Sequence, residues 1–282
     1  YLLDPGASAR TGRPAIEVRH RTRKKDGAWS VLKEFPLSPE RIALLANELD
    51  RETLAAVFGS LDTYTYYTTR QITRQRVLPE ILAEKYLPLL AASGRLWLGE
   101  TFSGKRAAPL EWDGGAPWAF TLELRQDEHD QWTILGAFRR GEQRLELAEA
   151  DLLMSPGLLV AQNRLARYDD GGAKAWLLKM RQLKQIRFPD RVRDAALKKL
   201  LESGSLPPLD VDEPLRYEER RVTPRLGLRV KQKREHWAEE YFEGQLLLDY
   251  GLGWMDQGAG NHWMEAERVL VVRDVSTEQH AE

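Results

Sequence analysis

The chain has 282 residues, of which 42% are hydrophobic and 30% are charged, a globular composition that excludes disordered, collagen-like and membrane-embedded chains. Lysine and arginine number 42 against 43 acidic residues, so no overall field draws the molecule onto nucleic acid or anionic lipid, and any basic site must be local. The sequence contains no cysteine, which excludes disulfides, zinc sites with thiolate ligands and cysteine nucleophiles.

Nothing in the sequence indicates a membrane or secretory destination. No apolar run approaches the roughly 20 residues of a membrane-spanning helix, and the N-terminus lacks the charged and apolar regions of a signal peptide. We therefore expect a cytoplasmic protein without a membrane partner. The chain begins at Tyr1 with an apolar run instead of a methionine, which suggests a segment of a longer protein.

The first third of the chain is predicted to contain a β-hairpin followed by helices. Over residues 14–35 apolar residues alternate with charged ones, and Asp26-Gly27 offers a tight turn between the two strands. Ser38, followed by a proline, begins one short helix and Asp50 caps a second. Pro79 begins a longer third helix.

The middle of the chain is predicted to form an antiparallel sheet. Short alternating runs over residues 95–160 are divided by glycine-rich turns, and two helices follow them. Residues 203–208, SGSLPP, are the best candidate for a linker, and alternation resumes beyond them. We therefore predict an α+β fold of antiparallel sheets with flanking short helices. It would divide into a domain of residues 1–204 and a small antiparallel β unit of residues 210–282.

Residues 99–106, GETFSGKR, space two glycines and a lysine like a phosphate-binding loop. Such a loop also needs a hydroxyl side chain that ligates magnesium and opens a helix. Arg106 stands at that position, and a strand-like AAP follows it. We therefore interpret the stretch as a β-turn that exposes the basic pair Lys105 and Arg106.

A cluster of five cations lies at the tip of the predicted hairpin, with its arginines spaced to share one strand face. Such a cluster suits the phosphate backbone of a nucleic acid, where clustered cations displace counterions. The same pattern is typical of a charged edge strand that discourages pairing between sheets, and the neutral net charge favours this second interpretation. The five residues are Arg19, Arg21, Arg23, Lys24 and Lys25.

The tryptophans, the histidines and an acidic turn could bind ligands, but most of them have patterns typical of structural roles. Most of the nine tryptophans alternate with aliphatic residues as core anchors do, whereas Trp237, Trp254 and Trp263 lie in polar surroundings typical of surface binders. The histidines have no metal-ligand spacing, and DDGG at residues 169–172 is typical of a turn and helix N-cap rather than of a cation site. Without a nucleophile elbow or a cysteine nucleophile, the sequence assigns no catalytic, cofactor-binding or metal-binding residue.

Six short stretches occur in an order that resembles the N-terminal region of large bacterial Swi/Snf-type helicase-like ATPases. The resemblance covers nearly the whole chain and lies in the order of the stretches, none of which is a catalytic motif. The stretches are YLLD at residues 1–4, RKKDGAW at 23–29, DR at 50–51, EWDGGAPWAF at 111–120, ARYDDGGA at 166–173 and LPPLD at 206–210.

This resemblance implies a parent protein whose paired RecA-like lobes hydrolyse ATP, with magnesium, to translocate on double-stranded DNA. Bacterial members of this kind are associated with DNA remodelling and with defence against phage. A complete phosphate-binding loop, an Asp-Glu-x-His box and an arginine-finger motif are all missing from the sequence, so no ATPase residue is carried over. ATP and magnesium would belong to an ATPase core outside these residues.

The leading hypothesis is a non-catalytic, helicase-associated accessory module that positions DNA or partner proteins for the ATPase core. It would contact double-stranded DNA without sequence preference through the hairpin cations, assisted by Lys105 and Arg106. Its other expected partners are the ATPase lobes of the same chain and proteins of a multi-subunit system. The alternative is a stand-alone protein-interaction scaffold that never binds nucleic acid, and an enzyme in its own right ranks below both.

Overall fold

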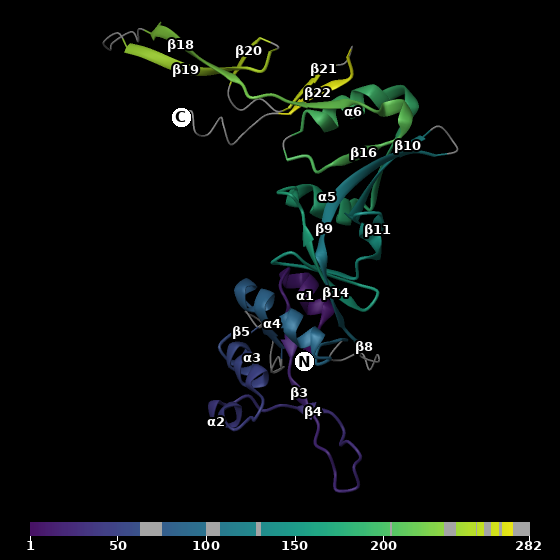
Figure 1. Ribbon diagram of the computed structural model, residues 1–282, viewed down its shortest axis with the longest axis vertical. Coiled ribbons are helices and arrows are strands. Elements are labelled where there is room, and N and C mark those ends of the chain that lie inside the picture. The colour runs from purple at the N-terminus through teal and green to yellow at the C-terminus, as the bar shows by residue number, and fades with distance from the viewer. Residues whose placement is uncertain are drawn as a thin grey trace, which may run out of the picture. The chain divides into compact units, whose positions relative to one another are not determined.

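The computed structural model describes residues 1–62, 75–99, 108–127, 131–203, 205–233, 241–251, 253–256, 261–264 and 267–272. The chain forms two compact units, one of residues 1–120 and 136–171 and the other of residues 121–135 and 172–282. Short helices accompany several mostly antiparallel sheets, which confirms the α+β class (Figure 1). The units are interleaved along the chain, whereas the sequence pattern predicts one boundary after residue 204.

A six-stranded sheet forms the centre of the first unit, with strand order β5-β6-β2-β1-β7-β8. β1 pairs with β7 in parallel, although the two strands are far apart in the sequence, and the other described pairs are antiparallel. The strands are β1 (Leu2–Leu3), β2 (Ala15–Glu17), β5 (Leu61–Asp62), β6 (Gln75–Val77), β7 (Trp97–Leu98) and β8 (Ala108–Pro109).

The described part of this unit contains four helices, and polar caps begin three of them. They are α1 (Pro5–Thr11), α2 (Pro39–Ala43), α3 (Glu48–Phe58) and α4 (Glu80–Ala92). Asp4 caps α1 and Ser38 caps α2, the latter as predicted. The predicted cap of α3 is wrong, because the amide oxygen of Asn47 accepts the backbone N–H of Asp50 (3.0 Å) and starts the helix earlier. Pro79 precedes α4 as predicted.

A second sheet adds β11 and β10 on one side of β9 and β14, β13 and β12 on the other. In the first unit β14 pairs with β9 in parallel, and the β10–β11, β12–β13 and β13–β14 pairs are antiparallel. The elements are β9 (Glu111–Gln126), β10 (Gln131–Arg140), β11 (Gln143–Glu146), η1 (Leu147–Glu149), β12 (Leu152–Met154), β13 (Leu158–Ala161) and β14 (Arg164–Asp169).

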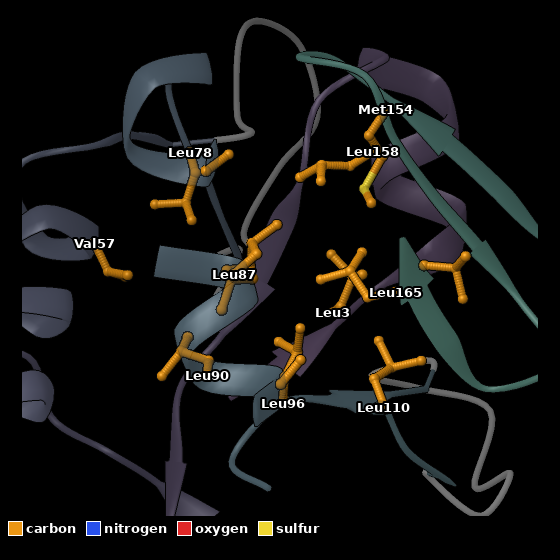
Figure 2. Packing of buried hydrophobic residues seen from close by; sticks show 14 of the residues in the cluster. Leu3, Val57, Leu78, Leu87, Leu90, Leu96, Leu110, Met154, Leu158 and Leu165 are labelled. Carbon is orange, nitrogen blue, oxygen red and sulfur yellow. The ribbon is translucent and has the colours of Figure 1, made fainter. Parts of the chain in front are cut away.

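The core of the first unit lies between its helices and one face of this second sheet. Leu87 and Leu90 of α4 pack with Leu3 of β1, and Leu158 and Leu165 approach from β13 and β14 (Figure 2). All five side chains are almost completely excluded from solvent. Their burial, worth about 1.5–3 kcal/mol for each leucine, fixes the sheets and helices that support the hairpin described below.

The second unit contains the remaining halves of β9 and β10 together with helices. β15 pairs with β10 and β16 pairs with β9. Trp132 of β10 is fully buried, and its indole N–H donates to the carboxylate of Asp190 (2.8 Å). The elements are α5 (Lys174–Leu183), β15 (Gln185–Pro189), η2 (Asp190–Val192), α6 (Arg193–Leu201), β16 (Leu209–Val211) and η3 (Glu213–Leu215).

Two three-stranded sheets, β17-β22-β21 and β18-β19-β20, follow in the same unit. β17 pairs with β22 in parallel and the other pairs are antiparallel, and Leu248 and Tyr250 pack against Val269 and Val271 to join the two sheets. The strands are β17 (Glu218–Arg221), β18 (Arg225–Lys233), β19 (Tyr241–Asp249), β20 (Trp254–Asp256), β21 (His262–Met264) and β22 (Val269–Val272). Among the described residues, no helix combines the length and the apolar character needed to cross a membrane.

Candidate nucleic-acid interface

The predicted hairpin exists, but it begins later than the alternation suggests. Residues 15–17 are buried between β1 and β6 in the six-stranded sheet, so they are not part of the hairpin. The hairpin proper starts at β3 (Arg19–His20), which pairs with β4 (Lys33–Glu34). From there it projects as the purple loop beyond β3 and β4 in Figure 1.

The Asp26-Gly27 turn forms as predicted. The backbone N–H of Gly27 donates to the carbonyl of Lys24 (3.0 Å), and that of Ala28 donates to the carboxylate of Asp26 (2.9 Å). Gly27 has φ +83°, a conformation in which glycine is strongly favoured. A local hydrogen-bond network therefore holds the tip of the hairpin.

A bulge interrupts the hairpin below its tip. His20 pairs with Lys33, whereas the backbone N–H of Ser30 donates to the carbonyl of Thr22 (2.9 Å). The returning strand therefore has one residue more than the outgoing strand between these two pairs. The extra residue lies in the segment of Val31 and Leu32, whose exposed fractions are 81% and 54%.

Arg19 has a different environment from the other predicted cations. Its guanidinium contacts the carboxylate of Glu17 through two nitrogens, Nε at 2.7 Å and Nη2 at 3.3 Å. The Glu17 side chain is only 1% exposed, and a buried carboxylate needs a cationic partner. The structure therefore places Arg19 at the base of the hairpin, where it compensates a buried charge.

The other four cations of the predicted cluster are exposed on the hairpin. The guanidinium of Arg21 lies over the ring of Trp29, 4.6 Å from its centroid, and Nε of Arg23 donates to the carbonyl of Gly27 (3.3 Å). Lys24 and Lys25 lie in the turn and are exposed. Stacking on a half-exposed indole orders a guanidinium without removing its charge from solvent.

Lys33 is an exposed cation of the hairpin that sequence reasoning missed. It lies opposite His20, and counting outward from the Asp26-Gly27 turn would have placed it beside the cluster. Lys105 and Arg106 lie outside the described residues, as does most of the GETFSGKR stretch.

The structure confirms some of the predictions for the surface tryptophans and the acidic turn, and contradicts others. Trp254 is exposed as predicted, at 52%. The prediction that Trp263 lies on the surface is wrong, because its side chain is 8% exposed and packs edge to face against Tyr217. Trp237 lies outside the described residues. Asp169 accepts the backbone N–H of Gly171 (2.9 Å), which confirms the turn, but α5 has no side-chain cap.

The long paired strands β18 and β19 (Figure 1) have a separate apolar surface. Leu226, Leu228 and Val230 alternate along β18, and their exposed fractions are 50%, 68% and 56%. Leu228 is paired with Leu246 of β19, so both side chains share one face of the sheet. Contiguous exposed apolar residues are typical of protein-interaction surfaces.

Comparison of the chain with protein-family models, with curated proteins and with solved structures found no match.

Proposed function

We propose that this chain is a non-catalytic module that contacts double-stranded DNA, and that the hairpin of residues 19–34 is the contact. The observation that supports this function is a local excess of charge. Five exposed cations accompany one carboxylate, Asp26, between Arg21 and Lys33, within a chain of net charge −1. The cations are Arg21, Arg23, Lys24, Lys25 and Lys33.

The carboxylate of Asp26 accepts a backbone N–H inside the turn, so it belongs to the local fold of the tip. The cations around it therefore give the hairpin a positive surface. Lysine and arginine side chains bind the phosphate backbone by displacing condensed counterions, and such contacts do not depend on base sequence. A two-stranded ribbon is also narrow enough to follow a groove of the duplex.

The order of the sequence stretches supports a wider role for this contact. In the proposed parent protein the hairpin would hold duplex DNA while a separate ATPase core binds ATP and magnesium and moves along the strand. The module would then position DNA, or partner proteins of the same system, for that core. It would act in the cytoplasm.

The test is a salt titration of duplex binding by fluorescence anisotropy, with the wild type and the double variant Lys24→Glu/Lys25→Glu. We expect the wild-type affinity to fall steeply with salt. The slope of the logarithm of the binding constant against the logarithm of the salt concentration should be smaller in magnitude by about 2 in the variant, because each lost phosphate contact removes about 0.9 from it. Both lysines are exposed in the turn, so the substitutions should leave the fold intact.

The matched control is Lys198→Glu/Lys199→Glu, which makes the same change of net charge on the exposed face of α6. We expect this control to keep the wild-type slope. A wild-type affinity that does not change between low and moderate salt would contradict the proposal. Equal losses in the hairpin variant and the control would also contradict it, because they would show an effect of net charge alone.

The exposed apolar face of β18 favours a second function, that of a protein-interaction scaffold. Leu228 is its most exposed aliphatic residue among Leu226, Leu228 and Val230. If this function holds, Leu228→Lys will abolish association measured by sedimentation, and reversal of the hairpin charges will have no effect on it.

A further inference from the structure

Two residues of the EWDGGAPWAF stretch, Asp113 and Trp118, help to line a pocket in the first unit. The pocket has a volume of about 320 Å³ and lies on the second sheet, where β9, β10, β11, β13 and β14 meet. Its size is at the lower end of the range for sites that hold small molecules.

Strand alternation explains why this face has an apolar floor. Leu158, Val160 and Leu165 point into the core of the unit. The residues that follow each of them in the sequence line the pocket on the opposite face, and these are Leu159, Ala161 and Ala166. Leu159 pairs with Ala166 across β13 and β14. Two alanines at these positions leave space that larger side chains would fill.

Arg140 is fixed in the pocket by contacts on several sides. Its Nη1 donates to Oδ1 of Asp113 (2.9 Å), and its Nε and Nη2 donate to Oε1 of Gln143 (3.2 and 3.0 Å). The guanidinium lies 4.4 Å from the ring centroid of Trp118. Arg140 is thus a rigid part of the wall, and it holds the indole beside it in place.

A bulge in β9 makes this arrangement possible. Asp113 pairs with Ala166 and Trp118 pairs with Tyr168, so β9 takes an excursion where β14 continues directly. A side chain at Gly115 would place its Cβ 2.6 Å from Nη1 of Arg140. A side chain at this position would therefore displace the guanidinium of Arg140.

The pocket has a positive balance of charge. Three arginines line it, Arg140, Arg144 and Arg164, against the one carboxylate of Asp113. Asp113 is already compensated, because it accepts hydrogen bonds from Arg140 and from the backbone N–H of Gly115 (3.1 Å). Arg144 forms an exposed ion pair with Glu146 (3.0 Å). Arg164 is exposed, and its positive charge acts on Asp113 from the edge of the pocket.

We propose that this pocket binds a phosphate monoester, with the phosphate at Arg164 and Arg144 and the organic group against Trp118 and the alanine floor. Guanidinium groups match phosphate oxygens in geometry and charge. An indole beside an apolar floor suits a planar group such as a nucleobase. Both parts together fit a nucleoside monophosphate. This group occurs in a free nucleotide and at the 5′-phosphorylated end of a DNA strand.

The experiment measures binding to the full chain by isothermal titration calorimetry, with AMP and inorganic phosphate as probes. We expect AMP to bind the wild type more tightly than phosphate does. Arg164→Gln should weaken AMP binding by about tenfold or more, because it removes a charge-assisted contact to phosphate. Arg167→Gln is the matched control, since Arg167 is exposed on the same strand but does not line the pocket.

Short single strands with a 5′-phosphate or a 5′-hydroxyl separate the two sources. In the Lys24→Glu/Lys25→Glu background, which weakens strand binding by the hairpin, tighter binding of the phosphorylated strand than of the 5′-hydroxyl strand assigns the site to a DNA end. Equal binding of the two strands, together with AMP binding, assigns the site to a free nucleotide. No binding of any probe at millimolar concentration, or equal AMP binding by the wild type and Arg164→Gln, overturns the proposal. The Lys24→Glu/Lys25→Glu variant should bind AMP normally, so the result is independent of the hairpin.

Discussion

The guanidinium of Arg19 contacts a carboxylate that is 1% exposed, whereas that of Arg21, two residues further on, lies over a half-exposed indole. The two arginines look equivalent in the sequence because they are two residues apart on one predicted strand. Their difference arises from Glu17, whose strand is buried between two others. Arg19 therefore stabilises the fold, and Arg21 is available for a ligand.

We expect Arg19→Ala to lower the free energy of unfolding by about 3 kcal/mol, because it leaves a buried carboxylate without its cation. Arg21→Ala should cost less than about 1 kcal/mol, since it removes only an exposed stacking contact. Urea unfolding followed by circular dichroism measures both values. Equal destabilisation by the two substitutions would show that Arg19 has no special structural role.

At the scale of elements, the ion pair between Asp113 of β9 and Arg140 of β10 ties two strands together. The hydrogen bond from Arg140 is the main cause that holds the pKa of Asp113 below its ordinary value of 3.8, and the charge of Arg164 adds to the effect. A lowered pKa in the folded state means that the charged carboxylate stabilises the fold. This contribution is fully present above pH 3.8 and is lost as the pH falls through the lower, folded-state pKa.

We expect Asp113→Asn to be less stable than the wild type at neutral pH, and the difference to shrink as the pH is lowered below 3.8. Thermal unfolding over a pH series measures it. Glu142→Gln removes an exposed carboxylate of the same unit and serves as the control. A stability difference between Asp113→Asn and the wild type that stays constant through this pH range would show that the ion pair is not the source.

The hairpin turn and the cap of α2 were within reach of the sequence, because their chemistry is local, whereas the caps predicted at Asp50 and at residues 169–172 do not form. The Asp26-Gly27 turn and the Ser38 cap form as predicted. The start of the hairpin was missed because alternation shows which face of a strand is buried but does not name its partners. Residues 15–17 alternate like hairpin residues, yet they pair with β1 and β6.

At the scale of the whole molecule, positive and negative charges nearly cancel, but they are distributed unevenly along the chain. A net charge of −1 coexists with a segment of the hairpin, residues 21–33, that holds five cations and one carboxylate. The net charge alone therefore favoured the interpretation as a charged edge strand. The division into these two units could not be predicted from the sequence for a related reason. β9 and β10 contribute to both units, and a long strand bears no local mark where one unit ends and the other begins.

The pocket shows the same limit of sequence reasoning. In the sequence, the EWDGGAPWAF stretch stands out only for its place in the order of the six stretches. Its role became visible only when Arg140, from the next strand, was placed beside Gly115 and Trp118. Contacts of this kind depend on how strands pair, and that pairing is set by the core of the unit.

The most direct test of the central claim is the chemical reactivity of single lysines with and without duplex DNA. Acetylation of the free chain and of the complex, followed by peptide mass spectrometry, reports the exposure of each side chain. We expect DNA to protect Lys24, Lys25 and Lys33, and to leave Lys198 and Lys199 as reactive as in the free chain. Protection of the α6 lysines with unchanged reactivity of the hairpin lysines would contradict the account.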